Sequence, residues 1–139
     1  MKASADIDGQ LGVTERSVWA ILDDEGKASV RAATKVLRSA VEEESPKRTR
    51  TLASSHKQSV TRTGYGYKGQ LKRHPRAWYG RIVERGRKAG RGRTGRRVGA
   101  ARANPFVERA AARVEPQAES LLAAGADRAA DRIEQQVVR

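Results

Sequence analysis

The apolar residues of the first third of the chain recur at helical spacing. Val18, Ile21 and Leu22 predict a first helix, which the sequence "DDEG" interrupts at residues 23–26. A second stripe of apolar side chains then follows at spacings of three and four residues, formed by Val30, Ala33, Leu37, Ala40 and Val41. It predicts a longer helix that ends before Pro46, because the residue that precedes a proline is pushed out of the helical region.

Helical spacing returns in the last third of the chain. Pro105 presets the backbone at the start of a short helix that carries Val107 and Val114, and a bend follows. Pro116 suits the first turn of a further, longer helix. The apolar stripe of that helix consists of Leu121, Leu122, Ala126, Ala129, Ile133 and Val137.

The segment between the two helical regions favours extended structure. Val60, Thr61 and Thr63 predict one strand within "SSHKQSVTRTG", and the aromatic and β-branched residues of "AWYGRIVERG" predict a second. The connection between them is "GYGYKGQLKRHPR". At the N-terminus, a short extended lead-in is expected over residues 1–13, with one strand around Ala5–Asp8.

Residues 86–103 have neither helical nor strand periodicity, and they contain too few apolar residues to fold alone. They predict a basic, flexible loop or arm within a single domain of residues 1–139. The fold class expected is α+β. A small antiparallel sheet would pack with an N-terminal helix and C-terminal helices, and the long basic loop would project from them.

Charge separates the middle of the chain from its two ends. Residues 47–103 hold 18 Lys or Arg and one acid, Glu84, whereas both flanking segments are slightly acidic. Such a density of like charge repels itself unless phosphates or the carboxylates of a neighbour compensate it. Only 37% of the residues are hydrophobic and 4% aromatic, so the core is expected to be thin and to be completed by other subunits.

The arginines of the basic arm, Arg91, Arg93, Arg96 and Arg97, allow two interpretations. They could lie along nucleic-acid phosphates without reading sequence, or they could order on the acidic face of a protein partner. Four nearby aromatic residues could stack on bases, but their spacing favours the core of a small sheet; these are Tyr65, Tyr67, Trp78 and Tyr79.

The sequence contains no motif that indicates an enzyme. Without cysteine the chain has no thiol nucleophile or zinc-thiolate site, and no phosphate-binding, hydrolase or metalloprotease motif is present. We interpret His74 as a surface histidine and Glu84 as an ion-pair partner of Arg81, of Arg85 or of a neighbouring subunit. No catalytic, cofactor-binding or metal-binding residue is therefore expected, and no apolar run is long enough to span a bilayer.

Three sequence blocks occur in a fixed order: "ESPKRTRTLASS", "WYGRIVERG" and "NPFVERAAARV". Together they resemble the neck or tail-completion proteins of long-tailed, lambdoid-type bacteriophages. The positions that match that family's pattern are Ser45, Pro46, Thr49, Leu52 and Ser55 in the first block, Tyr79, Val83, Glu84 and Gly86 in the second, and Pro105, Phe106 and Ala110 in the third. The chain departs from the pattern at Arg50 and Gly80, and at Glu108 or Arg109, near the family's second proline.

The residues in these blocks also have structural roles that chemistry predicts. Pro46 closes the N-terminal helix, and Thr49 can bond free backbone groups after it. Phe106, the only phenylalanine, is the expected anchor between helices and sheet, beside Pro105 at the start of the C-terminal helix. Tyr79 and Glu84 complete the set of expected structural or interface residues.

The resemblance implies a virion protein of the head-tail connector, assembled in the host cytoplasm. It would form a ring of six copies between the head-closure proteins and the tail terminator or tube, with non-specific contact to packaged DNA in the channel and no membrane partner. The alternative is a small basic nucleic-acid-binding protein, nucleoid- or ribosome-associated, that uses the same arginines.

Overall fold

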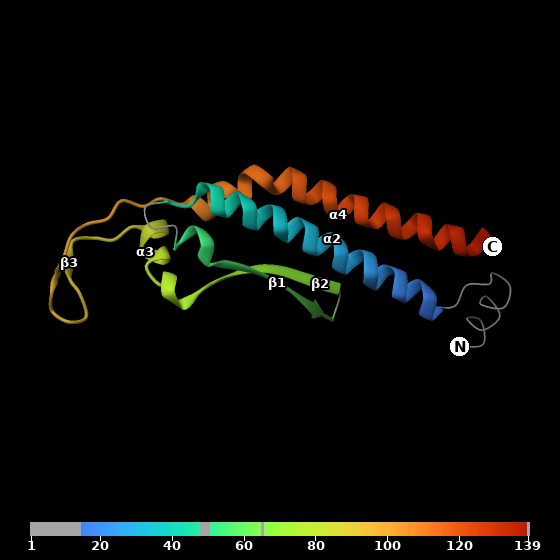
Figure 1. The fold of residues 1–139 in the computed structure, drawn as a ribbon, viewed down its shortest axis with the longest axis horizontal. Coiled ribbons are helices and arrows are strands. Elements are labelled where there is room, and N and C mark those ends of the chain that lie inside the picture. The colour runs from blue at the N-terminus through green and yellow to red at the C-terminus, as the bar shows by residue number, and fades with distance from the viewer. Residues whose placement is uncertain (1–14, 48–50, 65, 139) are drawn as a thin grey trace. The chain divides into compact units, whose positions relative to one another are not determined.

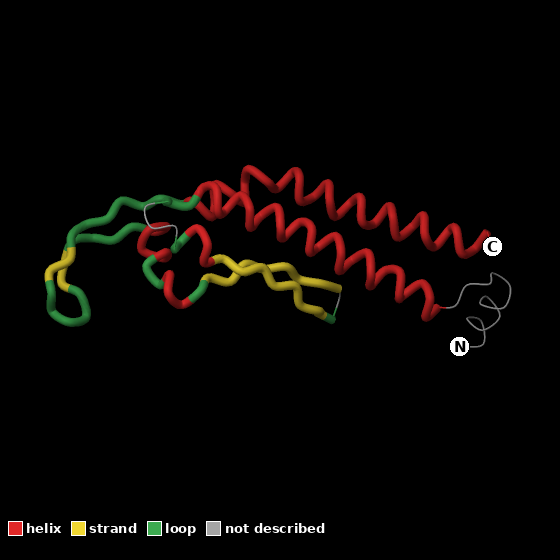
Figure 2. Tube along the Cα trace, in the orientation of Figure 1, coloured by secondary structure: helices red, strands yellow, loops and turns green. Residues whose placement is uncertain are grey.

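The computed structural model describes residues 15–47, 51–64 and 66–138, and its fold class is α+β, as expected (Figure 1). The order of elements is α2 (Glu15–Glu44), the 3-10 helix η1 (Ala53–Ser55), β1 (His56–Thr63), β2 (Gly66–Arg73), the 3-10 helix η2 (Pro75–Ala77), α3 (Gly80–Arg85), β3 (Gly90–Arg91), β4 (Arg97–Val98) and α4 (Phe106–Val138). They form two small antiparallel sheets, β1–β2 and β3–β4 (Figure 2). The predicted lead-in with its strand at Ala5–Asp8 lies outside the described residues.

The N-terminal helix α2 is continuous, so the predicted interruption at residues 23–26 is wrong. Acidic residues are tolerated in helices, and a single glycine costs only about 1 kcal/mol relative to alanine. The carboxylates of this segment also gain partners, because Asp23 pairs with Arg62 at 3.5 Å and Glu25 pairs with Arg128 at 3.1 Å. The helix ends at Glu44, as the proline at position 46 predicts.

The C-terminal helix α4 is also one element, so the predicted bend between two helices is wrong. Pro116 lies inside it, where a proline removes one backbone hydrogen bond and costs about 3 kcal/mol or more in an unsupported helix. Tertiary packing supplies support on either side of the proline, since Val114 and Ala129 are both buried.

The strand prediction was right for one segment and wrong for the other. β1 lies within the predicted "SSHKQSVTRTG" segment. Its partner β2 lies in the segment that was predicted to be a connection, whereas the predicted second strand, residues 77–86, instead holds α3. Tyr79 and Val83 are four residues apart and both pack against the buried core, which is the spacing of one helix face.

The chain divides into two compact units. The first combines segments 1–34, 59–70 and 116–139, and the second combines 35–58 and 71–115. The single domain expected over residues 1–139 stays a prediction.

Within the first unit, α2 packs between α4 and the β1–β2 hairpin through small residues. A Cβ atom added to Gly125 of α4 would lie 2.5 Å from Cβ of Ser29 on α2. Gly69 of β2 likewise leaves the space that the Thr34 side chain occupies. The absence of a side chain at these two glycines therefore sets how closely the three layers approach.

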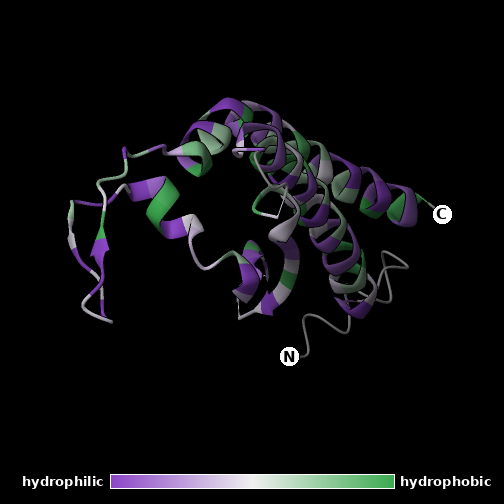
Figure 3. Cartoon of the chain, turned by 60° about the vertical axis from the view of Figure 1, so that its left-hand side comes forward, coloured by the Kyte–Doolittle hydropathy of each residue, from purple (hydrophilic) through white to green (hydrophobic). Residues whose placement is uncertain are grey.

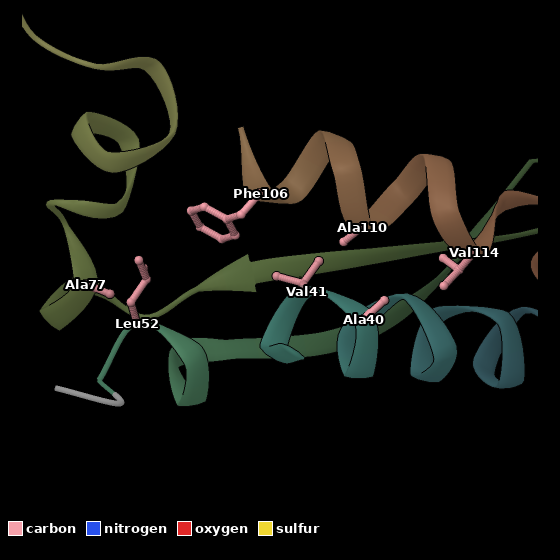
Figure 4. Close-up of a cluster of buried hydrophobic side chains, with 7 residues drawn as sticks. All are labelled: Ala40, Val41, Leu52, Ala77, Phe106, Ala110 and Val114. Carbon is pink, nitrogen blue, oxygen red and sulfur yellow. The ribbon is translucent and has the colours of Figure 1, made fainter. Parts of the chain in front are cut away.

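The second unit holds the main hydrophobic core (Figure 4). Phe106 at the start of α4 is fully buried, and its ring points toward Leu52 and Ala77. The remaining buried members come from α2 and α4 and are Ala40, Val41, Ala110 and Val114. Every large side chain of this cluster other than Phe106 is aliphatic, so the core is as thin as the composition predicts.

Candidate functional site

The basic segment of residues 86–103 contains a paired β-hairpin rather than an unstructured loop (Figure 2). Gly90 pairs with Val98 and Arg91 with Arg97 in antiparallel register. Further from the turn, Arg87 and Ala101 exchange both backbone hydrogen bonds at 2.8 Å. We call residues 87–101 the basic hairpin.

The turn of the basic hairpin is built by glycine. The amide of Gly92 donates to the carbonyl of Arg96 at 2.8 Å, and the amide of Gly95 donates to the carbonyl of Gly92 at 2.9 Å. Gly95 has a φ of +78°, the left-handed conformation that three-residue hairpin loops require at their last position. Arg93 and Thr94 occupy the exposed tip.

The hairpin is fixed at its base by a second glycine. Gly86 has a φ of +76°, and a Cβ atom there would lie 2.8 Å from the carbonyl oxygen of Ala101. Close by, the amide of Asn104 donates to the carbonyl of Val83 on α3 at 2.9 Å, and Nε of Arg87 donates to the carbonyl of Gly99 at 2.9 Å. The two ends of the hairpin are thereby held together beside α3.

All four arginines predicted to make contacts lie exposed on this hairpin: Arg91, Arg93, Arg96 and Arg97. Arg91 and Arg97 are direct cross-strand partners, an arrangement in which like charges destabilise the pair. Figure 3 shows purple and white stretches along the hairpin with some green between them, and the largest apolar side chain of the hairpin is that of Val98. Within the described ranges, no carboxylate lies at ion-pair distance from any of these four guanidinium groups.

Four arginines of α4 differ from those of the hairpin, because acidic residues of α2 compensate their charge. Arg113 reaches Glu43 at 2.7 Å and Glu44 at 2.9 Å, and Arg109 lies 3.7 Å from Glu44. In the first unit, Arg132 reaches Glu25 at 3.0 Å. The arginines of the basic hairpin, by contrast, have no carboxylate partner in the part of the chain that the structure describes.

Glu84, the lone acid of the basic middle, forms an ion pair, but with a different arginine from those predicted. Its Oε2 atom lies 3.5 Å from Nη2 of Arg73 at the end of β2, so the predicted pairing with Arg81 or Arg85 is wrong, whereas a further contact with an arginine of a neighbouring subunit stays a prediction. Nε of Arg73 is buried without a hydrogen-bond partner among the described residues. The pair links β2 to α3 in the second unit.

The other residues expected to be structural lie in or beside the core of the second unit. Phe106 confirms the predicted anchor, and Tyr79 packs against the same cluster. Pro46 follows α2 and is half-buried, while the carbonyl of Pro105 accepts the amide of Arg109 at 3.1 Å in the first turn of α4. Thr49 lies outside the described residues.

The four aromatic residues were predicted to form the core of a small sheet, and this prediction is wrong for Trp78. Trp78 is 71% exposed, and its ring meets that of Tyr79 edge-on with centroids 6.1 Å apart. Tyr67 of β2 is half-buried, and the carboxylate of Asp23 raises the pKa of its hydroxyl above the usual 10.0. Tyr65 lies outside the described part of the chain.

Two features escaped the sequence-based interpretation. His56 is only 4% exposed, although no motif marks it as a core residue. The hairpin itself had a signal, because Gly92 and Gly95 bracket a short polar loop of the type that joins paired strands.

The described residues offer little for small-molecule or metal chemistry. No group of three or more His, Cys, Asp or Glu among them is placed to hold a metal ion. A shallow hollow of about 340 Å³ is lined by Arg38, Glu42, Lys47, Ala53 and Ser54, where Arg38 already pairs with Glu42 at 3.1 Å. None of the described helices is both long and apolar enough to cross a bilayer.

Compared with known proteins, the chain matches no family model, no curated protein and no solved structure.

Proposed function

We propose that this protein is a structural subunit of a bacteriophage head-tail connector, a neck or tail-completion protein that assembles into a ring. The resemblance on which the proposal rests involves three sequence blocks separated along the chain. Its supporting observation is that each of the three blocks contributes matching residues to one core in the second unit, namely Leu52, Tyr79, Val83, Phe106 and Ala110. We infer that the blocks specify this core and thereby the shape that a subunit presents to its neighbours.

Each block supplies a distinct part of that core. From the first block, Leu52 is 2% exposed and the hydroxyl of buried Ser55 donates to its carbonyl at 2.7 Å. The second block contributes the apolar face of α3 and the obligatory glycine at position 86. The third contributes Phe106 and Ala110, both fully buried.

Exposed apolar side chains supply a reason for oligomerisation. Trp78 is 71% exposed in the second unit, and Trp19 is 63% exposed in the first. Large aromatic side chains in contact with water are typical of residues that anchor protein interfaces. In a closed ring, two different surfaces of each subunit meet, so such residues would be covered by the next copy.

Mass photometry of the purified chain at low and high salt, without nucleic acid, tests the proposal. A ring is expected near six times the chain mass of 15.2 kDa, and it should persist at high salt because apolar contacts are not screened. Replacement of Trp78 or Trp19 by serine should shift the population to smaller species. The matched control is Arg31→Ser, at an exposed and charged position of α2, which should leave the ring intact.

A monomer or dimer at every salt concentration would overturn the proposed ring. If that small species then gathered only on nucleic acid and dispersed with salt, the alternative of a free nucleic-acid-binding protein would replace it.

A further inference from the structure

The arginines of the basic hairpin have no carboxylate at ion-pair distance among the described residues. Residues 86–103 hold seven Lys or Arg and no acid. Where arginines face helix α2, by contrast, the chain supplies carboxylates, as Glu43 and Glu44 do for Arg113. Other described arginines, such as Arg31 and Arg81, also lack a carboxylate at ion-pair distance, but the hairpin places four arginines within the seven residues 91–97. This density of charge points to a counter-charge that comes from another molecule.

The backbone of the hairpin distributes these charges over both of its faces. Arg91 and Arg97 are cross-strand partners, so their side chains leave the same face. The side chain of Arg96 is next to Arg97 in sequence and leaves the opposite face, while Arg93 stands at the tip. A ligand that carries negative charge on both sides of an inserted ribbon would meet all of them.

The chemistry between the arginines favours nucleic acid over an acidic protein. The other side chains of the segment are glycine, alanine, one lysine, one threonine and the half-buried Val98. The centres of protein interfaces are enriched in aromatic residues, Met and Arg, and of these the segment offers Arg alone. Small residues instead let a backbone approach closely, and a two-stranded ribbon fits the major groove of duplex DNA between its two rows of phosphates.

We propose that the basic hairpin of residues 87–101 binds the sugar-phosphate backbone of duplex DNA without sequence preference. The segment has no Asn, Gln, Asp or Glu, which removes the side chains that pair with adenine and cytosine; Arg can still pair with guanine, so a preference for guanine-rich duplexes would contradict the absence of sequence preference. This binding goes beyond ring assembly and does not require it, because the hairpin is complete within one chain.

The expected signature is a steep dependence of affinity on salt. Each phosphate neutralised contributes about 0.9 to the slope of log K against log salt concentration, so four arginines would give a slope of about −3.6. Affinity would then fall by about 150-fold between about 50 and 200 mM salt.

Fluorescence anisotropy of the full chain with short labelled duplexes of two unrelated sequences tests the proposal. The double variant Arg91→Gln/Arg97→Gln should reduce the slope by about 1.8, equally for both sequences. The matched control is Arg109→Gln/Arg113→Gln, which removes the same charge from arginines that pair with Glu43 and Glu44. The control should retain most of the binding, with circular dichroism to check that both variants are folded.

Three outcomes would overturn the proposal: no DNA binding at low salt, equal losses in the two variants, or binding of poly-glutamate in place of DNA. The last would assign the hairpin to an acidic protein partner. Mass photometry on the same samples keeps the two proposals separate. A ring that ignores DNA contradicts only the hairpin assignment, and a small species that binds DNA through Arg91 and Arg97 contradicts only the ring.

Discussion

The imidazole of His56 lies edge-on to the ring of Phe106, with centroids 6.2 Å apart and ring planes at 74°. This contact joins the first residue of β1 to the first residue of α4 inside the core of the second unit. Both imidazole nitrogens are buried, and neither has a hydrogen-bond partner among the described residues. A protonated imidazole would therefore be poorly solvated there.

We predict that the protein loses stability as the pH falls below about 6.5. Burial, and then the charge of Arg73, lower the pKa of His56 from its ordinary 6.5, while the nearby backbone of Ala53 and the carboxylate of Glu42 oppose the shift less strongly. Between the lowered pKa and 6.5, the unfolded chain binds a proton that the folded chain does not, so the free energy of unfolding rises with pH over that interval. Urea unfolding at a series of pH values measures it.

Replacement of His56 by glutamine provides the control for this pH dependence. The variant should have a much weaker dependence of the free energy of unfolding on pH over the same interval, because carboxylates titrate at lower pH. An unchanged pH dependence in His56→Gln would contradict the assignment to His56.

Phe106 is predicted to be the most sensitive position of the core. It is fully buried and is the only phenylalanine, so truncation to alanine should cost about 3–5 kcal/mol, a large part of the stability of a small domain. Phe106→Leu keeps most of the volume and should cost less, which allows measurement if the alanine variant fails to fold. Leu122→Ala, at a position that is 42% exposed, is the control and should shift the urea midpoint far less.

The spacing of apolar residues predicted the buried positions correctly in helices that bury one face only. Val41 and Phe106 were predicted to face the core and do so. The predicted break of the N-terminal helix was wrong because tertiary contacts outweigh local preference there. Glu25 pairs with Arg128, and α2 continues through the acidic segment. Local propensity contains no information on such partners.

The strand error has a similar origin. In β2, half-buried Tyr67 and Gly69 flank exposed Lys68, but Gln70 and Leu71 are both half-buried, so the period of two is incomplete and a glycine in the middle further conceals it. The charge of the basic hairpin could be read from composition, but its register depends on backbone pairing between Arg91 and Arg97, which composition does not encode.

Gly125→Ala is predicted to destabilise the first unit although alanine is the better helix former. The preference of a helix for alanine is worth about 1 kcal/mol. The added methyl group would lie 2.5 Å from Cβ of Ser29, and relief of such overpacking costs about 1–3 kcal/mol because two helix backbones must separate. Thermal unfolding should show a lower midpoint, and the double variant Ser29→Gly/Gly125→Ala should recover part of the loss. A higher midpoint for the single variant would mean that the helices separate freely.

Glu25 is predicted to keep its charge at lower pH than an ordinary glutamate. Hydrogen bonds from Arg128 and then Arg132 lower the pKa of its carboxyl group below the usual 4.5. A lowered pKa contributes stability above pH 4.5 that is lost as the pH falls through the folded value, so the wild type should lose more stability than Glu25→Gln on acidification below about 4.5. NMR titration of the side chain gives its pKa directly, and a normal value would show that the two arginines do not hold it in solution.

Gly86→Ala is predicted to open the base of the basic hairpin. Alanine is strained at a φ of +76°, and its methyl group would lie 2.8 Å from the carbonyl oxygen of Ala101, which accepts the amide of Arg87. Hydrogen exchange at the amides of Arg87 and Ala101 should accelerate, since both are hydrogen-bonded across the hairpin. Gly90→Ala is the matched control, because no atom lies within 4 Å of the added methyl group. If both variants exchanged at the wild-type rate, the hairpin would not depend on Gly86, and its arginines would be positioned by the turn at Gly95 alone.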